Sequence, residues 1–331
     1  MKIAVTGASG HVGANLIREL LSQKYDVRAL IHEDCLALDG LDIEKVKIDV
    51  TNEDSLFKAF ENIDIVFHLA AIISIIGGRK GKVYNTNVIG TRNVVSACLK
   101  RKVKRLVHFS SIHAFAQDPL NEALNETRKL VDEDGKKHPA YDMSKAQGIR
   151  EVQKGISMGL DAIIVCPTAV LGPNDYRHSR MGKVLCMLSK QTLPGLVGGG
   201  FNWVDARDVS RGAIEASKNG KTGEIYLLSG NWHSVKELAQ FVEKVSGKKS
   251  PSITYPLWMA NIGAMAITPF AKILDKEPLF TTEAMLALKA NQNILCDKAQ
   301  KDFGYSPRDT HETVKDTLTW FDKEGIIKLK K

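Results

Sequence analysis

The sequence has few cysteines and no long apolar segment, and both absences exclude classes of protein. The five cysteines are scattered without a close pair: Cys35, Cys98, Cys166, Cys186 and Cys296. We therefore expect neither a zinc site nor a redox dithiol, and no metal site is predicted. Polar residues and prolines interrupt the most apolar segment, Tyr255 to Leu274. We expect a pair of buried helices there rather than a membrane span.

The chain also lacks a basic stripe, although its formal net charge is +8 at pH 7. Its lysines and arginines are spread along the sequence without interleaved aromatic residues, so nucleic acid is not an expected partner. The charge fits a solvated surface and an anionic small ligand. A glycine-rich turn begins at residue 6 and leaves no room for a signal peptide, so we expect a cytoplasmic protein.

That turn is the most informative segment that is present. The apolar strand Lys2-Ile3-Ala4-Val5 runs into Thr6-Gly7-Ala8-Ser9-Gly10-His11-Val12-Gly13, and a helical pattern follows from Ala14 to Ser22. Gly7 permits a tight turn, Gly10 lets backbone N–H groups approach a pyrophosphate, and Gly13 lets the helix pack on the strand. An ordinary strand-to-helix turn is the alternative, but the placement predicts a dinucleotide site at the helix N-terminus.

The first half of the chain alternates short apolar runs with helical patterns, notably Val83 to Lys100 and Tyr141 to Ser157. The runs expected to be strands lie near Ile3, Val27 to Ile31, Val46 to Ile48, Ile65 to His68, Leu106 to Phe109 and Ala162 to Cys166. Their Val, Ile and Leu content is typical of strands buried on both faces. The predicted fold is α/β, a Rossmann-type doubly wound parallel sheet with a smaller, mostly helical C-terminal substrate lobe.

Domain boundaries follow from a change of rhythm after Pro167. We predict a dinucleotide-binding domain over residues 1–166, to which residues 204–229 return, and a substrate lobe made of residues 167–203 and 230–331. The polar stretch from Asn121 to His138 is interpreted as a mobile loop or lid.

Several residues are candidates for contact with the rest of the dinucleotide. Asp49, before Val50, can accept from an adenine amino group or cap the next helix. Leu69, Ala70 and Ala71 end the fourth strand with an apolar and two small side chains. A ribose-binding acid is expected after the second strand for NAD, but Ile31 and His32 stand there.

His32 and Arg28 are nearby donors for a ribose 2′-phosphate, so NADP is favoured. NAD stays open, because Glu33 and Asp34 can still reach a ribose hydroxyl.

A catalytic group is predicted from Tyr141 and Lys145, whose spacing places both on one face of a helix. An ammonium beside the phenol would lower the pKa of Tyr141 toward the range of a general acid or base. The strand Leu106 to Phe109 ends in Ser110-Ser111 at the edge where ligands bind, and Ser111 can hydrogen-bond a substrate carbonyl. A solvated tyrosine and a turn-capping serine are the alternatives.

These motifs together resemble the extended short-chain dehydrogenase/reductase family, the NAD-dependent epimerase/dehydratase superfamily. The resemblance is closest to its dihydroflavonol reductase and 3β-hydroxysteroid dehydrogenase branch. It includes the glycine turn, Asp49-Val50, His68 to Ala71, Asn87 to Thr91, Ser110-Ser111, Tyr141 with Lys145, Pro167 to Pro173, Arg207-Asp208-Val209 and Tyr226 to Gly230.

The resemblance implies a role for each matching residue. Tyr141 would donate the proton, Lys145 would hold the nicotinamide ribose, Ser111 would polarise the carbonyl and Asn87 would support the site. Pro167, Thr168, Ala169 and Val170 would line the nicotinamide. The family often dimerises through the helices that carry Asn87 and Tyr141; the apolar residues Val94, Val95, Ala97 and Cys98 permit this and equally suit a core.

The chain departs from the family patterns at two places. No acid pair follows Ser111, so dehydration is not expected, and His32 stands where dihydroflavonol reductases have an arginine. His113 is interpreted as a packed loop histidine. Arg177, His178 and Arg180 can meet an anionic group or face water.

The predicted function is NADP(H)-dependent reduction of a ketone or aldehyde, or oxidation of the matching alcohol. An NAD-dependent sugar epimerase is the alternative enzyme, since the chemistry at Tyr141 would be nearly the same. A nucleotide-sensing protein without turnover is a third hypothesis, against which Ser111, Tyr141 and Lys145 together argue.

Overall fold

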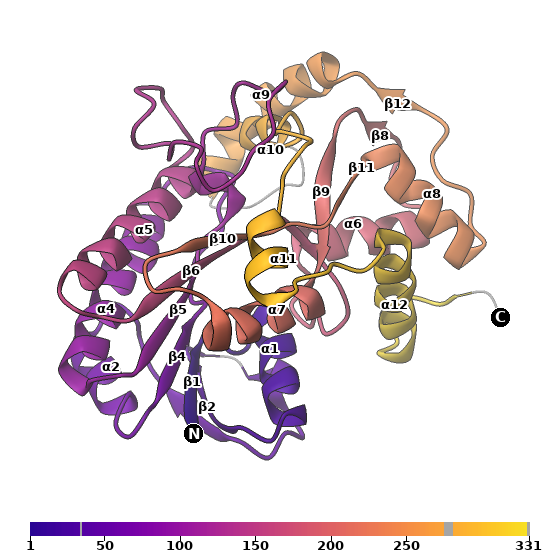
Figure 1. The fold of residues 1–331 in the computed structure, drawn as a ribbon. Coiled ribbons are helices and arrows are strands. Elements are labelled where there is room, and N and C mark those ends of the chain that lie inside the picture. Colours follow the sequence, from indigo (N-terminus) through magenta and orange to yellow (C-terminus); the bar gives the residue numbers. More distant parts are fainter. Residues whose placement is uncertain (34, 275–280, 330–331) are drawn as a thin grey trace.

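The computed structural model of the chain has a seven-stranded parallel sheet at its centre (Figure 1). In spatial order the strands are β10 (Ile225–Leu228), β6 (Ala162–Pro167), β5 (Arg105–Phe109), β4 (Ile65–His68), β1 (Lys2–Thr6), β2 (Asp26–Ile31) and β3 (Glu44–Lys47). The strand order reverses between β1 and β4, and ligands bind beyond the carboxyl ends of the strands at such a switch point. The structure describes residues 1–33, 35–274 and 281–329, with the backbone alone for 266–274.

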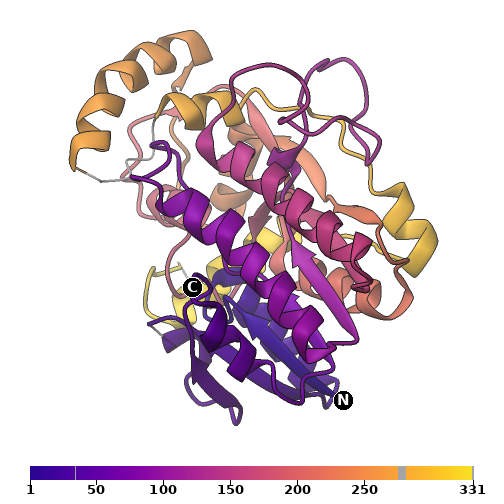
Figure 2. The ribbon, with the colours of Figure 1, turned by 90° about the vertical axis from the view of Figure 1, so that its left-hand side faces the viewer.

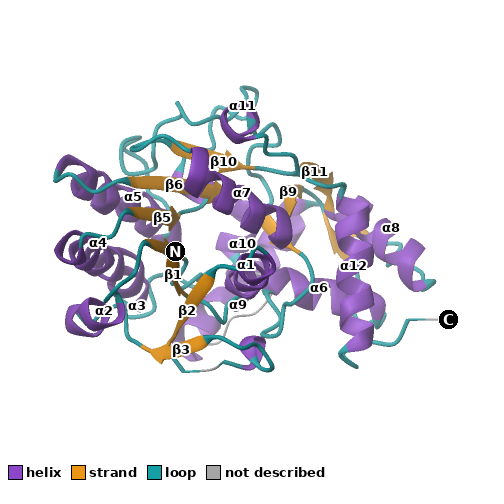
Figure 3. Cartoon of the chain, turned by 60° about the horizontal axis from the view of Figure 1, so that its bottom comes forward, coloured by secondary structure: helices purple, strands orange, loops and turns teal. Residues whose placement is uncertain are grey.

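Helices cover both faces of this sheet, which confirms the predicted doubly wound fold (Figure 3). One face packs against α2 (Glu53–Ala59), α4 (Gly90–Arg101) and α5 (Ala140–Ser157). The other packs against α1 (His11–Ser22), α7 (Ala206–Asn219) and α11 (Asp297–Phe303). Burial on both faces explains the apolar strands, since every residue of β6 is buried.

The helix predicted from Val83 to Lys100 is divided in the structure. It consists of α3 (Lys82–Tyr84), a π-helical turn η2 (Asn85–Ile89) and α4. Gly90 begins α4 against Val50, and a Cβ atom at Gly90 would lie 2.8 Å from a Val50 methyl. The apolar residues Val94 to Cys98 that suit a dimer interface or a core lie in the core. A dimer through these helices, which stays a prediction, would have to use their outer sides.

A smaller second lobe follows β6. Its three-stranded sheet is β11 (Asn231–Ser234), β9 (Gly200–Asp205) and β7 (Ala169–Leu171), and β8 (Leu196–Val197) pairs with β12 (Thr254–Tyr255). Its helices are α6 (Arg180–Ser189), α8 (Val235–Ser246), α9 (Leu257–Leu274), α10 (Thr282–Ala287) and α12 (Thr310–Lys323). Two short 3₁₀ helices, η1 (Leu36–Leu38) and η3 (Ile112–Ala114), complete the secondary structure of the described residues.

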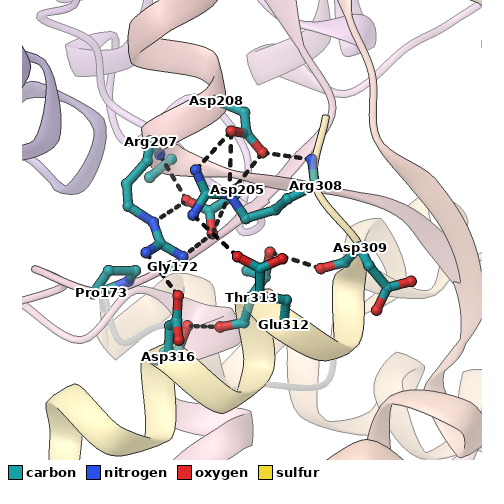
Figure 4. A network of polar contacts seen from close by, with 12 residues as sticks. Gly172, Pro173, Asp205, Arg207, Asp208, Arg308, Asp309, Glu312, Thr313 and Asp316 are labelled. Atoms are coloured by element: carbon teal, nitrogen blue, oxygen red, sulfur yellow. Dashed lines mark hydrogen bonds and ion pairs between the residues drawn. The ribbon is translucent and has the colours of Figure 1, made fainter. Parts of the chain in front are cut away.

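A buried ion network fastens α7 to the C-terminal segment before α12 (Figure 4). Asp205 and Asp208 are buried, and Arg207 bonds to Asp205 at 2.7 Å. Arg308 bonds to Asp208 at 2.9 Å. Arg207 also reaches Asp316 on α12 at 2.7 Å. The Arg207-Asp208 pair of the family motif therefore joins distant parts of the chain.

Two predictions about irregular segments are wrong. The stretch from Asn121 to His138 is anchored rather than mobile, because Leu124 and Leu130 lie in the core and Glu126 accepts a hydrogen bond from the Leu227 N–H on edge strand β10. The segment from Leu257 to Leu274 is one helix with an exposed side, not a buried pair. In the described part of the chain, no helix is long and apolar enough to cross a membrane.

Candidate active site

The turn after β1 is closed by packing that only glycine permits. Gly7 has a φ of +66°, and a Cβ atom there would lie 2.8 Å from the Ala70 nitrogen. A Cβ at Gly13 would collide with the Gly7 carbonyl oxygen, which accepts a hydrogen bond from the Gly10 N–H at 3.0 Å. The helix therefore begins directly against the strand end, as a pyrophosphate-binding turn requires.

The other residues of the turn connect it to neighbouring elements. The Thr6 hydroxyl lies 2.8 Å from His68 Nδ1 and accepts from the Ala70 N–H at 3.2 Å. His11 Nε2 lies 3.0 Å from the Gly172 carbonyl oxygen in the second lobe. Ser9 accepts a hydrogen bond from Arg177 at 3.3 Å, and Val12 packs into the core. His11 and Ser9 thus join the turn to residues 172–177.

At the end of β2, His32 is the basic residue that stays accessible. Its side chain is 66 % exposed and lies 3.7 Å from Glu33. Arg28 is turned away, since it donates to the carbonyl oxygens of Ala59 and Glu61 at 2.7 and 3.0 Å. Asp34 lies outside the described residues. Of the two basic residues predicted as donors for a ribose 2′-phosphate, only His32 is therefore placed to serve.

Asp49 holds the turn after β3. Its Oδ1 accepts from both the N–H and the hydroxyl of Thr51 at 2.8 Å, and these bonds, together with the charge of His32, keep the pKa of Asp49 below its usual value. Asn52 rather than Asp49 caps α2. Asp49 is exposed and near enough to His32 for the charge of His32 to lower its pKa, while Val50 is buried.

Asn87 fixes the loop that follows β4. Its side-chain oxygen accepts from the Ile72 N–H at 2.8 Å, and its Nδ2 donates to the Ser144 hydroxyl at 2.9 Å. The half-buried segment Leu69-Ala70-Ala71 precedes this loop. Asn87 thus connects that loop to α5, the helix of Tyr141.

Ser111, Tyr141 and Lys145 meet at the carboxyl edge of β5. The Ser111 side chain lies near enough to the Tyr141 phenol to act on its pKa. Lys145 Nζ donates to the Phe109 carbonyl oxygen at 2.9 Å, and its side chain is buried. Ser110 points elsewhere, toward the Lys145 carbonyl oxygen.

Burial governs the protonation of this group. It raises the pKa of Tyr141 to about 12, although the nearby Ser111 side chain and the charge of Arg180 act in the opposite direction. It lowers the pKa of Lys145 to about 8. The lowered Tyr141 pKa predicted from the sequence is therefore wrong for the chain alone, because burial of the phenol outweighs the groups that lower its pKa.

His113 lies beside this group in η3. Its ring contacts Tyr141 edge-on, and its Nδ1 lies 3.4 Å from Asp142 Oδ1. Its backbone N–H donates to the Ser111 hydroxyl at 3.2 Å. Burial lowers the pKa of His113, but the hydrogen bond and charge of Asp142 outweigh it and hold the pKa above its usual value. His113 is packed, as predicted from the sequence, but it also pairs with Asp142 and contacts Tyr141, which the sequence analysis missed. The only available signal was the acidic residue Asp142 next to Tyr141 in the sequence.

Residues 167–170 carry the chain from the first lobe to the second. Pro167 ends β6, and Ala169 and Val170 begin β7. The Thr168 hydroxyl donates to Asn202 on β9 at 2.9 Å. Arg180, at the start of α6, donates to the Ile73 carbonyl oxygen at 3.2 Å and so reaches back across the site toward the loop after β4.

One buried pair of side chains escaped the sequence analysis. His68 and His108 stack beneath the site with centroids 5.3 Å apart. His68 bonds Thr6 and Thr91 through its two ring nitrogens, at 2.8 and 3.1 Å. Both histidines were apparent in apolar strands, but only their pairing in adjacent β4 and β5 shows that they touch. Within residues 1–33, 35–274 and 281–329, no group of three His, Cys, Asp or Glu side chains is placed to hold a metal ion.

Known proteins share this architecture. The model of the NAD dependent epimerase/dehydratase family matches residues 3–229. The chain belongs to this family. It is 30 % identical to "Sterol demethylase protein B" of Methylococcus capsulatus, with 99 % of this chain and all of that protein covered.

Two further relatives match over nearly the whole chain. The putative dihydroflavonol 4-reductase of Synechocystis is 28 % identical, with 98 % of this chain and 95 % of that protein covered. The crystal structure of gox2253 superposes with a TM-score of 0.85 at 29 % identity, covering 98 % of this chain and 99 % of that one. The chain is thus an NAD(P)-dependent oxidoreductase of the extended short-chain type, as its motifs predicted.

The residues present fit a nicotinamide dinucleotide. The glycine turn leaves no room for a Cβ at Gly7 or Gly13, which keeps its N–H groups approachable. The Lys145 ammonium is buried beside the Ser111 and Tyr141 hydroxyls, where a ribose and a carbonyl oxygen are the matching partners.

Proposed function

We propose that the protein reduces a ketone or aldehyde with NADPH, or oxidises the matching alcohol with NADP, and that Tyr141 is the general acid and base. The observation that carries this proposal is the gathering of Ser111, Tyr141 and Lys145 at the carboxyl edge of β5. There Ser111 and Lys145 are buried, and His113 contacts both the Tyr141 ring and the Ser111 hydroxyl. The bound dinucleotide would supply or accept the hydride.

The chain's own groups then have distinct tasks. The Ser111 hydroxyl accepts a hydrogen bond from the backbone N–H of His113, which leaves its own proton available to Tyr141 or to a substrate oxygen. Tyr141, with a pKa near 12, is protonated at neutral pH and so is set to donate its proton to the carbonyl oxygen. Lys145 would hold the nicotinamide ribose, and Pro167 to Val170 would line the nicotinamide.

The cofactor preference rests on the end of β2. Neither Ile31 nor His32 is an acid, and His32 is exposed, so a 2′-phosphate meets a basic side chain. Arg177 at Ser9 adds a positive charge beside the glycine turn. We therefore favour NADP over NAD as the cofactor. Residues 1–166 and 204–229 would hold the dinucleotide. We also infer a cytoplasmic location for the protein.

The remaining segments, 167–203 and 230–331, would select the substrate. Relatives are named for a sterol and for a dihydroflavonol. We infer from these names that a ring ketone or alcohol is the substrate class to test first.

Replacement of Tyr141 tests the chemistry. We expect Tyr141→Phe to lower kcat for the reduction of ring ketones by about 10³-fold, within the range of general acid catalysis. The Kd for NADPH should stay within about twofold of the wild type, because the phenol hydroxyl is a small part of the dinucleotide contact. Tyr84→Phe, on exposed α3, is the matched control. Full activity of Tyr141→Phe would refute the proposal.

Cofactor exchange separates the reductase from the epimerase hypothesis. A reductase should release its dinucleotide and oxidise NADPH in proportion to the product formed. Tightly retained NAD in the purified protein, with nucleotide-sugar isomerisation and no net redox change, would support the epimerase instead.

A further inference from the structure

Exposed apolar side chains gather at one margin of the second lobe. Of the thirteen large apolar side chains that are exposed in the described residues, seven lie on or beside β12, α9 and α10: Ile253, Tyr255, Trp258, Met259, Ile262, Met265 and Leu286. We call these seven side chains the apolar face. Figure 2 shows α9, in orange, at the outer edge of the molecule.

Within α9 the exposed side chains follow the helix period. Trp258, Ile262 and Met265 are spaced by four and three residues and therefore share one side. Their exposed fractions are 64, 61 and 61 %. The inner side carries the smaller residues Leu257, Ala260 and Ala264. A surface helix normally buries its large apolar side chains, whereas α9 exposes them to water.

Positive charge borders this apolar face. The segment from Ser250 to Ala271 contains no charged residue, and Lys248 and Lys249 precede it. Lys249 is exposed, as is Lys289, three residues beyond Leu286. A symmetric dimer through this face would place the lysines of both copies at the margin of one interface and would supply no other charge than that of the same face. An anionic phospholipid surface offers both an apolar layer and negative headgroups.

We propose that the apolar face docks the protein on an anionic phospholipid surface, with α9 lying in the plane of the headgroups. Tyr255 and Trp258 suit this position, because aromatic rings with a polar atom favour the headgroup level. Lys249 and Lys289 would lie near the lipid phosphates. The helix lies on the surface and does not span it.

Vesicle binding by the full chain tests the proposal. Cosedimentation should occur with vesicles of equimolar phosphatidylcholine and phosphatidylglycerol, weaken at high salt, and be much lower with phosphatidylcholine alone. The double variant Ile262→Asn/Met265→Asn should lower the partition coefficient by at least about tenfold, since two exposed apolar side chains are lost. Lys249→Gln and Lys289→Gln should each lower it roughly fivefold.

Two controls separate docking from general stickiness. Met158→Asn removes a methionine that is 70 % exposed on the end of α5, away from the apolar face, and should bind vesicles like the wild type. Trp258 should give a blue shift of tryptophan emission on vesicle addition that Trp258→Phe removes, because Trp203 is buried already and Trp232 and Trp320 are half-buried on β11 and α12.

Equal partition of the wild type and the Ile262→Asn/Met265→Asn variant would overturn the proposal. A concentration-dependent dimer in light scattering that this variant abolishes, without vesicle binding by the wild type, would also overturn it and assign the face to a second copy. Each variant should retain the circular dichroism spectrum and NADPH affinity of the wild type, because all substituted side chains are exposed.

Discussion

The imidazole of His113 lies edge-on against the phenol of Tyr141, with centroids 5.9 Å apart, while its Nδ1 faces Asp142 at 3.4 Å. Asp142 follows Tyr141 on α5, whereas His113 lies in η3, which follows β5 and Ser111. The ion pair therefore joins the two elements that bring Ser111 and Tyr141 together. The protonation of His113 in this ion pair can be measured.

Asp142→Asn should move the pKa of His113 from above its usual 6.5 to below it. The carboxylate that raises the pKa is removed, while the burial that lowers it stays. The pKa can be measured from the NMR titration of the ring. Asp134→Asn, which removes the partner of His138 elsewhere, should leave the His113 pKa unchanged. An unaltered His113 pKa in Asp142→Asn would show that the ion pair does not form in solution.

The affinity for NADPH should fall as the pH rises through 8. Lys145 has its pKa lowered to about 8, so its ammonium, which would hold the ribose, is lost above that pH. The Kd should approach a tenfold increase per pH unit, or about 1.4 kcal/mol. In Lys145→Met the Kd should be weaker and independent of pH in this range, whereas Lys154→Met should behave as the wild type. Fluorescence titration measures both, and a parallel pH dependence in Lys145→Met would exclude Lys145 as the cause.

The folded protein should lose stability as the pH falls below about 6.5. Burial lowers the pKa of His68 to about 3 and that of His108 well below 6.5. At a pH between the usual histidine pKa of 6.5 and the lowered pKa in the folded protein, the unfolded chain binds protons that the folded chain does not. Protonation therefore favours unfolding in this range. Each histidine contributes a slope of about 1.4 kcal/mol per pH unit.

His108→Leu should remove its share of that slope. Neither ring nitrogen of His108 has a hydrogen-bond partner among the described residues, so the substitution should cost little at neutral pH. Urea unfolding at several pH values measures the slope. His32→Gln, at an exposed site, should keep the wild-type slope; an equal slope in His108→Leu would contradict the assignment.

Asp208→Asn should destabilise the fold by about 3 kcal/mol. Asp208 is 1 % exposed and bonds to Arg308 and Arg211, so its loss removes the shortest ion pair of Arg308, whose side chain is 13 % exposed and which keeps Asp205 only at 3.5 Å. Asp118→Asn, which breaks the exposed pair with Lys136, should cost less than about 1 kcal/mol. Urea unfolding compares the two, and equal costs would show that the network in Figure 4 does not stabilise the fold.

The parallel sheet could be predicted because buried strands need apolar residues on both faces. The run from Ile65 to His68 was predicted with the bounds that β4 has. The glycine turn was equally readable, since Gly7 and Gly13 occupy positions where a Cβ would meet backbone atoms. The helix from Val83 onward was located but not its π-helical turn, which depends on packing against neighbouring elements.

The segments that failed were those whose partners lie far away in sequence. The stretch from Asn121 to His138 has a polar composition, yet Leu124 and Leu130 anchor it. The apolar composition of α9 suggested burial, but in its described part Ala264 packs in a cluster with Val197 and Met285, while Trp258, Ile262 and Met265 are exposed. Arg28 and His32 looked equivalent near the end of β2, and only the position of α2 turned Arg28 away.

The sequence by itself determined the parallel sheet and the glycine turn, and it predicted Ser111, Tyr141 and Lys145 as candidate site residues. Apolar runs, glycine positions and the spacing of Tyr141 and Lys145 along one helix can each be read from a short segment. Tertiary structure decided the protonation of Tyr141, the pairing of His113 with Asp142 and the exposure of α9. These properties depend on burial and on charges brought together from separate elements, and no single segment of the chain contains that information.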